Sequence, residues 1–155
     1  MKVAVIGDLF VVNEVLQAAF EEAFEGSGLQ FEYVYETFDW PVVPVQKNDE
    51  ISEFVGDPDK ICKIVPDVEI ILTHSAPIPR KVIDAAKALK IVGAARGGPV
   101  NINWQACTER GIPVLYAPGR NSGAVAEFTV GMMLAQSRNI TLSLIHISEP
   151  TRLLS

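Results

Sequence analysis

Residues 69–101 read EIILTHSAPIPRKVIDAAKALKIVGAARGGPVN, and two kinds of pattern alternate along them. Residues 69–75 and 91–95 are short apolar runs, which favour buried strands because a strand covered on both faces has no polar side. Residues 79–90 lie between these runs and predict a helix. A strand, a helix and a second strand at this spacing form a unit with parallel strands and a right-handed crossover.

The same alternation extends over the rest of the chain. Further strands are predicted at 2–7, 29–36 and 112–117, and further helices at 11–26, 57–65, 103–111 and 124–140. The segment 38–49 carries prolines and is predicted to be irregular. This pattern predicts an α/β protein with a mostly parallel sheet and helices on both of its faces.

Some helices carry more specific expectations. In 11–26, six apolar residues at helical spacing predict one buried stripe: Val12, Val15, Leu16, Ala19, Phe20 and Phe24. Gly26 is expected to close this helix in the left-handed conformation, and Gly111 is expected to close the helix over 103–111. Asp57 and Pro58 are expected to be the N-cap and first residue of the helix over 57–65.

Composition narrows the class of protein. The chain has 155 residues, 48% of them hydrophobic and 21% charged, with a formal net charge of −6 and no basic run. We therefore expect no nucleic-acid partner. No apolar run reaches about 18 residues and the N-terminus lacks a signal peptide, so we expect no membrane partner and a cytoplasmic location. Cys62 and Cys107 are far apart and are expected to be buried thiols.

In parallel sheets ligands bind at the carboxyl ends of the strands, so the loops that follow the strands are the candidate sites. Asp8 follows the first strand without a GxGxxG motif and is expected to be a loop or cap residue, with a phosphoacceptor role as the alternative. His74 and Ser75 follow a later strand. They are expected to be ordinary loop residues rather than catalytic ones, because the sequence shows no acid placed to orient the histidine.

The loop after residues 91–95 is the best candidate. Gly97 and Gly98 let backbone N–H groups turn toward an anion, and Arg96 offers a planar charged group suited to a carboxylate. The alternative is a tight turn with positive φ and a solvated Arg96. In the next loop, Asn121 or Ser122 is expected to cap the following helix.

Residues 89–140, LKIVGAARGGPVNINWQACTERGIPVLYAPGRNSGAVAEFTVGMMLAQSRNI, resemble the D-isomer-specific 2-hydroxyacid dehydrogenases. The positions that match the pattern of the family are Gly93, Gly98, Asn101, Gly111, Ile112, Val114, Pro118, Asn121, Val125, Ala126, Glu127 and Arg138. The resemblance implies a flavodoxin-like substrate-binding domain over 1–100, and a last βα unit with a crossing helix over 101–141. It also implies hydride transfer between NAD or NADP and a small D-2-hydroxy or 2-oxo acid.

The resemblance also implies roles for particular residues. The loop Arg96–Pro99 would hold the substrate carboxylate with the backbone amides of Gly97 and Gly98, and Gly97 would lie against the nicotinamide. Asn101 would pin this loop. The crossing helix would help to form a homodimer, with three apolar residues at the interface: Phe128, Met132 and Met133.

Departures from the family pattern limit the substrate. Thr73 and Ala94 stand where phosphoglycerate-specific members carry arginines, which makes phosphoglycerate doubtful. Arg96 stands where the family commonly has glycine, and we expect it to favour a second anionic group on the substrate.

In the family, the GxGxxG loop and the catalytic arginine, glutamate and histidine follow the crossing helix. Residues 142–152, LSLIHISEPTR, look instead like a translated transposase sequencing adapter. We therefore expect 142–155 to be a cloning or assembly scar, His146 to have no role, and the fragment to be inactive with no catalytic or metal-binding residue of its own. The alternative function is a stand-alone flavodoxin-like binding or signalling module without hydride chemistry.

Overall fold

The computed structural model describes residues 1–39 and 45–143. The chain forms two compact units, Met1–Pro118 and Gly119–Ser155, and each is described by itself. The predicted division at residue 100 concerns function and stays a prediction.

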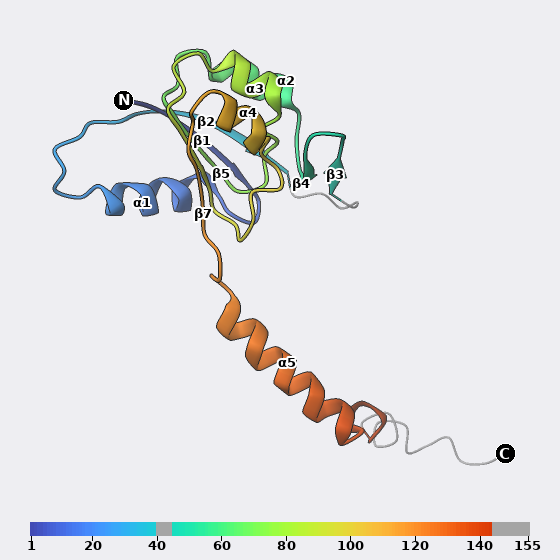
Figure 1. Ribbon diagram of the computed structural model, residues 1–155. Coiled ribbons are helices and arrows are strands. Elements are labelled where there is room, and N and C mark those ends of the chain that lie inside the picture. The colour runs from blue at the N-terminus through green and yellow to red at the C-terminus, as the bar shows by residue number, and fades with distance from the viewer. Residues whose placement is uncertain (40–44, 144–155) are drawn as a thin grey trace. The chain divides into compact units, whose positions relative to one another are not determined.

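The first unit contains a five-stranded sheet in which all neighbouring strands are parallel. In spatial order its strands are β2 (Glu32–Phe38), β1 (Lys2–Asp8), β5 (Ile70–Thr73), β6 (Ile91–Ala94) and β7 (Val114–Tyr116) (Figure 1). Counted within the sheet, the order is second, first, third, fourth and fifth, which is the order of flavodoxin-like folds. The predicted fold class is confirmed.

Helices cover both faces of this sheet. They are α1 (Asn13–Ala23), α2 (Pro58–Ile64), α3 (Arg80–Ala85) and α4 (Trp104–Glu109). In β1, Val3 and Val5 join the core under α1, whereas Ala4 and Ile6 join the larger core under α2, α3 and α4. Because β1 is buried on both faces, it has the continuous apolar sequence from which it was predicted.

The ends of two helices follow the predicted residue chemistry. Asp57 is the N-cap of α2, its side chain accepts a hydrogen bond from the Asp59 N–H at 2.8 Å, and Pro58 is the first helical residue. Gly111 follows α4 with a φ of +67°, in the left-handed region that glycine tolerates. Both predictions are confirmed.

The buried stripe predicted for α1 is wrong. Leu16 is buried and Phe20 is half-buried, but the other four predicted positions are exposed, Val15 by 57%. Among the described helices of this unit α1 alone packs on its face of the sheet, so it touches the sheet along a narrow line and its flanks lack a neighbour. The helix also ends at Ala23, before Gly26, which does have a positive φ of +76°.

A short antiparallel hairpin was missed by the sequence analysis. It consists of β3 (Gln46–Lys47) and β4 (Ser52–Phe54). The Ser52 N–H donates to the Val100 carbonyl at 2.8 Å, and the Val55 N–H donates to the Ser75 carbonyl at 3.0 Å. The hairpin therefore touches two of the loops at the carboxyl edge of the sheet. Residues 40–44 of the segment predicted to be irregular lie outside the described residues.

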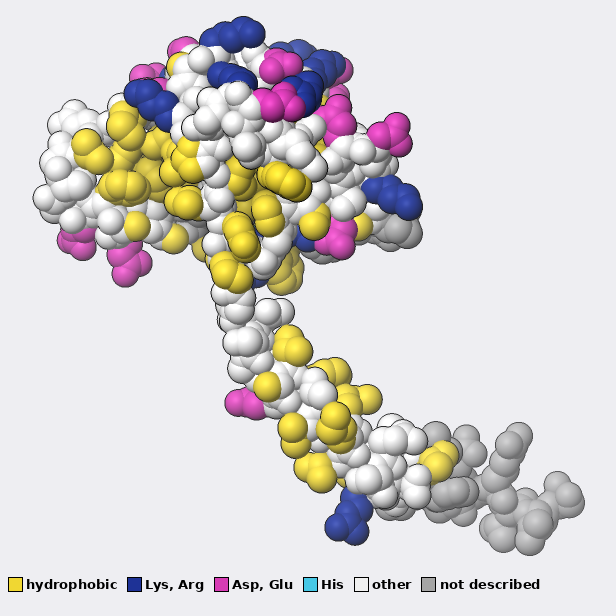
Figure 2. Space-filling model, viewed as in Figure 1, with side chains coloured by type: hydrophobic (Ala, Val, Ile, Leu, Met, Phe, Trp, Pro, Cys, Tyr) yellow, Lys and Arg dark blue, Asp and Glu magenta, His cyan; other side chains and the backbone are white. Residues whose placement is uncertain are grey.

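The second unit contains α5 (Ser122–Ser137). Asn121 is its N-cap residue, but its side chain makes no capping hydrogen bond. Its backbone, with a φ of −109° and a ψ of 11°, is not in the extended conformation that a capping side chain needs to reach the second or third N–H of the helix. Hydrophobic side chains lie along the exposed surface of α5 (Figure 2). None of the helices described is long and apolar enough to cross a membrane. His146 and the rest of 144–155 lie outside the described residues.

Candidate functional site

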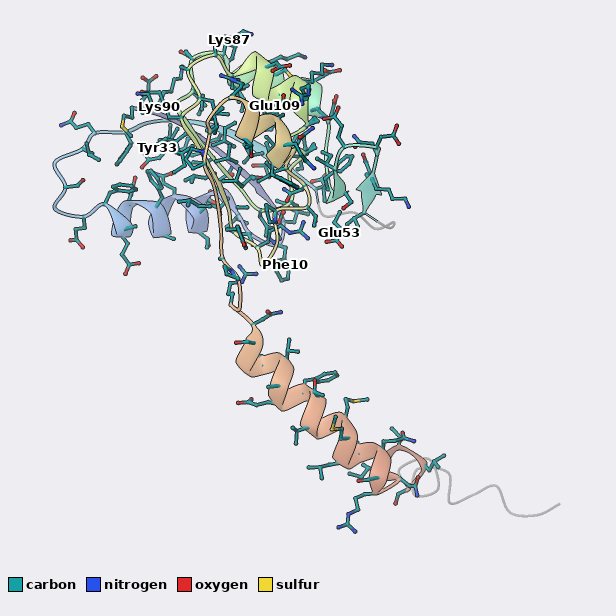
Figure 3. The ribbon with its side chains drawn as sticks, viewed as in Figure 1. Phe10, Tyr33, Glu53, Lys87, Lys90 and Glu109 are labelled. Atoms are coloured by element: carbon teal, nitrogen blue, oxygen red, sulfur yellow. The ribbon has the colours of Figure 1, made fainter. Side chains whose placement is uncertain are left out.

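The candidate site lies at the carboxyl edge of the sheet, where the loops after β1, β5 and β6 meet. The strand order reverses direction between β1 and β5, and such a switch point is where ligands bind in open parallel sheets. Phe10 and Glu53 lie at this edge, at the lower end of the first unit in Figure 3, and Lys87 and Glu109 lie at the opposite end.

Asp8, at the end of β1, is 1% exposed and uses both carboxylate oxygens. Oδ1 accepts the backbone N–H groups of Phe10 at 2.9 Å and Val11 at 2.8 Å. Oδ2 lies 2.7 Å from His74 Nδ1 and accepts a short hydrogen bond from the Ser75 hydroxyl. Asp8 is therefore the loop cap that was expected, but it also binds a histidine and a serine.

The expectation that no acid orients His74 is wrong. The acid is 66 positions away in the sequence and comes into contact only because β5 pairs with β1. His74 is buried, and its ring stacks on the Phe10 ring with centroids 5.8 Å apart and an interplanar angle of 24°.

Asp8 remains charged despite its burial. Burial disfavours the carboxylate, but hydrogen bonds from Ser75, the Val11 N–H and His74 outweigh it and hold the pKa of Asp8 below its usual value. A buried carboxylate with all its neighbours donating to it is a fixed negative charge.

Arg96 is held by the hairpin rather than solvated. Its guanidinium donates from Nη1 to the Glu53 carbonyl at 3.0 Å and from Nη2 to the Glu53 carboxylate. Glu53 has a φ of +51°, which is uncommon for a residue other than glycine and turns its carbonyl toward Arg96. The guanidinium thus joins β4 to the loop after β6.

Gly97 and Gly98 face open space. Neither has a positive φ, so the alternative of a tight turn requiring glycine is wrong. A Cβ built at either position meets no atom within 4 Å, so no neighbour in the described chain requires a glycine there. The loop is held at its base, where the Ala95 N–H donates to the Thr73 carbonyl at 2.8 Å and the Ala117 N–H to the Arg96 carbonyl at 3.0 Å.

Asn101 connects this loop to the loop after β5. Its side chain is fully buried, and Nδ2 donates to the Ala76 carbonyl at 2.8 Å and to the His74 carbonyl at 3.3 Å. The Ile78 N–H donates to the Asn101 carbonyl at 2.9 Å. Asn101 thus pins residues 96–101 against residues 74–78.

The structure brings Asp8, His74, Ser75, Arg96, Gly97, Gly98 and Asn101 to one edge. Thr73 and Ala94, the two uncharged residues that argued against phosphoglycerate, are in register in neighbouring strands and are buried. No group of three or more His, Cys, Asp or Glu side chains that could hold a metal ion occurs among residues 1–39 and 45–143. The contacts of Asp8 and Glu53 were not predicted, because they depend on strand order and on the hairpin.

Comparison with known proteins gives a family match. The family described as "D-isomer specific 2-hydroxyacid dehydrogenase, catalytic domain" matches residues 35–148 of this chain. The chain is 37% identical over 101 residues to the hydroxypyruvate reductase of Thermotoga maritima, covering 64% of this chain and 33% of that protein. It is 35% identical over 107 residues to the glyoxylate reductase of Thermofilum pendens, covering 69% of this chain and 28% of that protein.

A solved structure with a similar fold is the NAD-dependent formate dehydrogenase from Staphylococcus aureus in complex with NAD. The TM-score is 0.63 at 21% sequence identity, over 97% of this chain and 41% of that one. The chain thus spans less than half the length of the relatives that it matches.

Proposed function

Because the chain belongs to the D-isomer specific 2-hydroxyacid dehydrogenase family, we propose that its first unit is the substrate-binding part of an oxidoreductase. The proposed reaction transfers a hydride between a nicotinamide dinucleotide, NAD or NADP, and a small D-2-hydroxy or 2-oxo acid. The loop of residues 96–101 would bind the acid.

The observation that carries this proposal is the open side of Gly97 and Gly98. Both glycines lie beside the switch point, and nothing within the described chain fills the space that a Cβ would take at either residue. Backbone N–H groups on such a loop suit a carboxylate, because they donate hydrogen bonds and the glycines have no side chain to block access to them. Because Arg96 and Asn101 hold the loop at its two ends, the donors would be in place before the acid arrives.

The contribution of this chain to the reaction would be binding and orientation. When bound, a nicotinamide dinucleotide would supply the hydride acceptor for the hydrogen on C2 of the hydroxy acid. The residues 96–101 would hold the carboxylate next to C2 and thereby fix which face of that carbon is presented. The 155-residue sequence contains no GxGxxG, so we propose that the chain binds the acid without turnover.

The substrate would be small and would carry no phosphate. Thr73 is fully buried and Ala94 is 6% exposed, and neither side chain carries the charge that a phosphate would need. Arg96, the cation of this loop, is paired with Glu53. Glyoxylate and hydroxypyruvate, which the names of two relatives suggest, are therefore the first acids to test.

The test is a calorimetric titration of the chain with glyoxylate, hydroxypyruvate and 3-phosphoglycerate. We expect heat from the first two acids alone. A double variant, Gly97→Ala with Gly98→Ala, adds two methyl groups to the open side of the loop. It should weaken binding of the acid by about tenfold, which corresponds to the loss of at least one hydrogen bond.

The matched control is Gly123→Ala with Gly131→Ala on α5, where an added Cβ also meets nothing within 4 Å. This control should bind normally. A folded chain that gives no heat with any 2-oxo acid would refute the proposal, and so would equal affinities of the two double variants.

We also propose that α5 forms part of a homodimer interface. Phe128 is 70% exposed and Met133 is 65% exposed on this helix, and apolar patches of this kind mark interaction surfaces. Light scattering across a concentration series should give a dimer, and Phe128→Glu should give a monomer. A monomer for the unaltered chain would refute this part of the proposal.

A further inference from the structure

We propose that Asp8 is a positioning residue, which fixes the imidazole tautomer of His74 and, through residues 74–76, the place of the loop 96–101. The second half of this inference rests on the proposed function, because it concerns the loop that would bind the acid. The first half is a statement about the imidazole ring alone.

Asp8 joins two loops into one body. Its four donors come from the loop after β1, at Phe10 and Val11, and from the loop after β5, at His74 and Ser75. The turn made by the first two donors also places the Phe10 ring against the imidazole. His74 is therefore held at its Nδ1 edge by the carboxylate and at one ring face by Phe10.

The carboxylate determines which ring nitrogen carries the proton. An ionised carboxylate can only accept hydrogen bonds, so Nδ1, which lies 2.7 Å from Asp8 Oδ2, must carry hydrogen. In the neutral imidazole, Nε2 then has the lone pair and acts as an acceptor. The hydroxyl of Ser75 must also point its hydrogen at Asp8.

An amide at position 8 would reverse this arrangement. In Asp8→Asn the backbone N–H groups of Phe10 and Val11 still need an acceptor, so the amide oxygen stays on their side. The amide NH₂ then faces His74 and donates to Nδ1, which must lose its hydrogen. The neutral ring would carry its proton on Nε2 instead, while the side chain keeps nearly the same shape.

The position of His74 reaches the substrate loop through Asn101. Nδ2 of Asn101 donates to the carbonyls of His74 and Ala76, so the segment that Asp8 fixes is the segment on which Asn101 is seated. The Thr73 carbonyl, next to His74, accepts the Ala95 N–H at the base of the same loop. A shift of residues 74–76 therefore moves both ends of the loop 96–101.

The first measurement is nitrogen NMR of the imidazole rings in the ¹⁵N-labelled chain. The sequence has two histidines, His74 and His146, and the signals of His74 are those lost in His74→Gln. At neutral pH we expect the unaltered chain to show hydrogen on Nδ1, and Asp8→Asn to show it on Nε2. Hydrogen on Nε2 in the unaltered chain, or the averaged signals of a ring free to exchange tautomers, would overturn the proposal.

The matched control is Ser75→Ala, which removes one donor to the same carboxylate and leaves the Asp8–His74 contact. It should keep hydrogen on Nδ1; a switch to Nε2 in this variant would count against a role of Asp8 in choosing the tautomer. If Asp8→Asn does not fold, the spectra of the unaltered chain and of Ser75→Ala still decide the question.

The second measurement concerns the loop. In Asp8→Asn, the amides of Gly97 and Gly98 should exchange with solvent about fivefold faster, and glyoxylate should bind about fivefold more weakly, the factor expected when a charge-assisted hydrogen bond to a carboxylate becomes a neutral one. Unchanged exchange would overturn the link between Asp8 and the loop. If tautomer and exchange change as expected but neither form binds a 2-oxo acid, the proposed function fails and the role of Asp8 stands.

Discussion

Replacing Asn101 with alanine tests whether the candidate loop is held by a buried side chain. Asn101 is the link between residues 96–101 and the loop after β5, through its bonds to the carbonyls of His74 and Ala76. The substitution removes both bonds and leaves the backbone of each loop intact. It should therefore lower stability and also loosen the loop that we propose binds the acid.

The size of the stability loss follows from the contacts. Two neutral hydrogen bonds contribute about 2 kcal/mol together, and leaving buried carbonyls without a donor adds about 1 kcal/mol more. An offset of about 1 kcal/mol arises because Asn101 Oδ1, which is buried without a partner among the described residues, disappears as well. We expect the free energy of unfolding to fall by about 2 kcal/mol.

Urea unfolding gives this quantity, and calorimetric titration with glyoxylate gives the effect on binding. The matched control is Asn103→Ala, two residues away. Asn103 also makes two side-chain bonds, accepting from the Ala106 N–H at 2.9 Å and donating to Glu50 at 2.8 Å, but neither reaches the loop after β5. It should lose about 1 to 2 kcal/mol as a helix cap and bind glyoxylate normally.

Two results would refute this account of Asn101. One is a stability loss below about 0.5 kcal/mol, the scale of an ordinary surface substitution. The other is an equal loss of glyoxylate affinity in both variants, because that would trace the effect to general destabilisation.

Three further predictions follow from the structure. Folding lowers the pKa of Asp8, so its charge stabilises the protein above its unfolded pKa of about 3.9. The difference in stability between the unaltered chain and Asp8→Asn should therefore shrink as the pH falls below that value. A constant difference between their urea midpoints from pH 6 to pH 2.5 would contradict this. Cys107 is buried as expected, but the expectation that Cys62 is buried is wrong, because Cys62 is only partly buried. Burial raises the pKa of the Cys107 thiol to about 11, so a thiol reagent should label Cys62 first and Cys107 only after unfolding. Equal labelling rates of the two thiols in the folded protein would contradict this prediction. Gly56 has a φ of +106°, and an added Cβ would lie 2.4 Å from the Phe38 ring. Gly56→Ala should therefore lower the free energy of unfolding in urea by about 2 kcal/mol or more. An unchanged free energy of unfolding would show that the Phe38 ring moves freely.

The sequence pattern was sufficient to predict the fold class and several helix ends. Alternating apolar runs and helical stretches identify β1, β5 and β6, and the Asp57–Pro58 pair places the start of α2, because these signals act over a few neighbouring residues. The buried stripe of α1 could not be predicted, because exposure of Val15 depends on which elements pack beside the helix. Of the β3–β4 hairpin, β3 lies in the segment 38–49, whose prolines suggested irregular backbone, and β4 lies in residues 50–56, for which no element was predicted.

In the candidate site, too, features set by neighbouring residues were predicted and contacts between distant segments were not. The loop of Gly97 and Gly98 was predicted from its residue types, and the structure leaves its open side available. The partner of Arg96 was not predicted. Its guanidinium turns to Glu53, which belongs to the missed hairpin, so the cation that was expected to favour a second anionic group on a substrate is paired within the protein.

The contact between Asp8 and its partners follows from strand order together with a constant register. Along β1 and β5 each residue pairs with the one 67 positions later, so continuing the ladder past its last pair brings Asp8 opposite Ser75. The same extension from β5 to β6 brings Ser75 opposite Arg96. Once β1 is known to lie beside β5, an acid, a hydroxyl and a guanidinium must therefore stand in one row at the carboxyl edge. Burial decides which of these side chains are in contact. Asp8 is enclosed and needs hydrogen-bond donors, so His74 and Ser75 turn toward it. Arg96 lies nearer the surface and pairs with Glu53 of the hairpin instead.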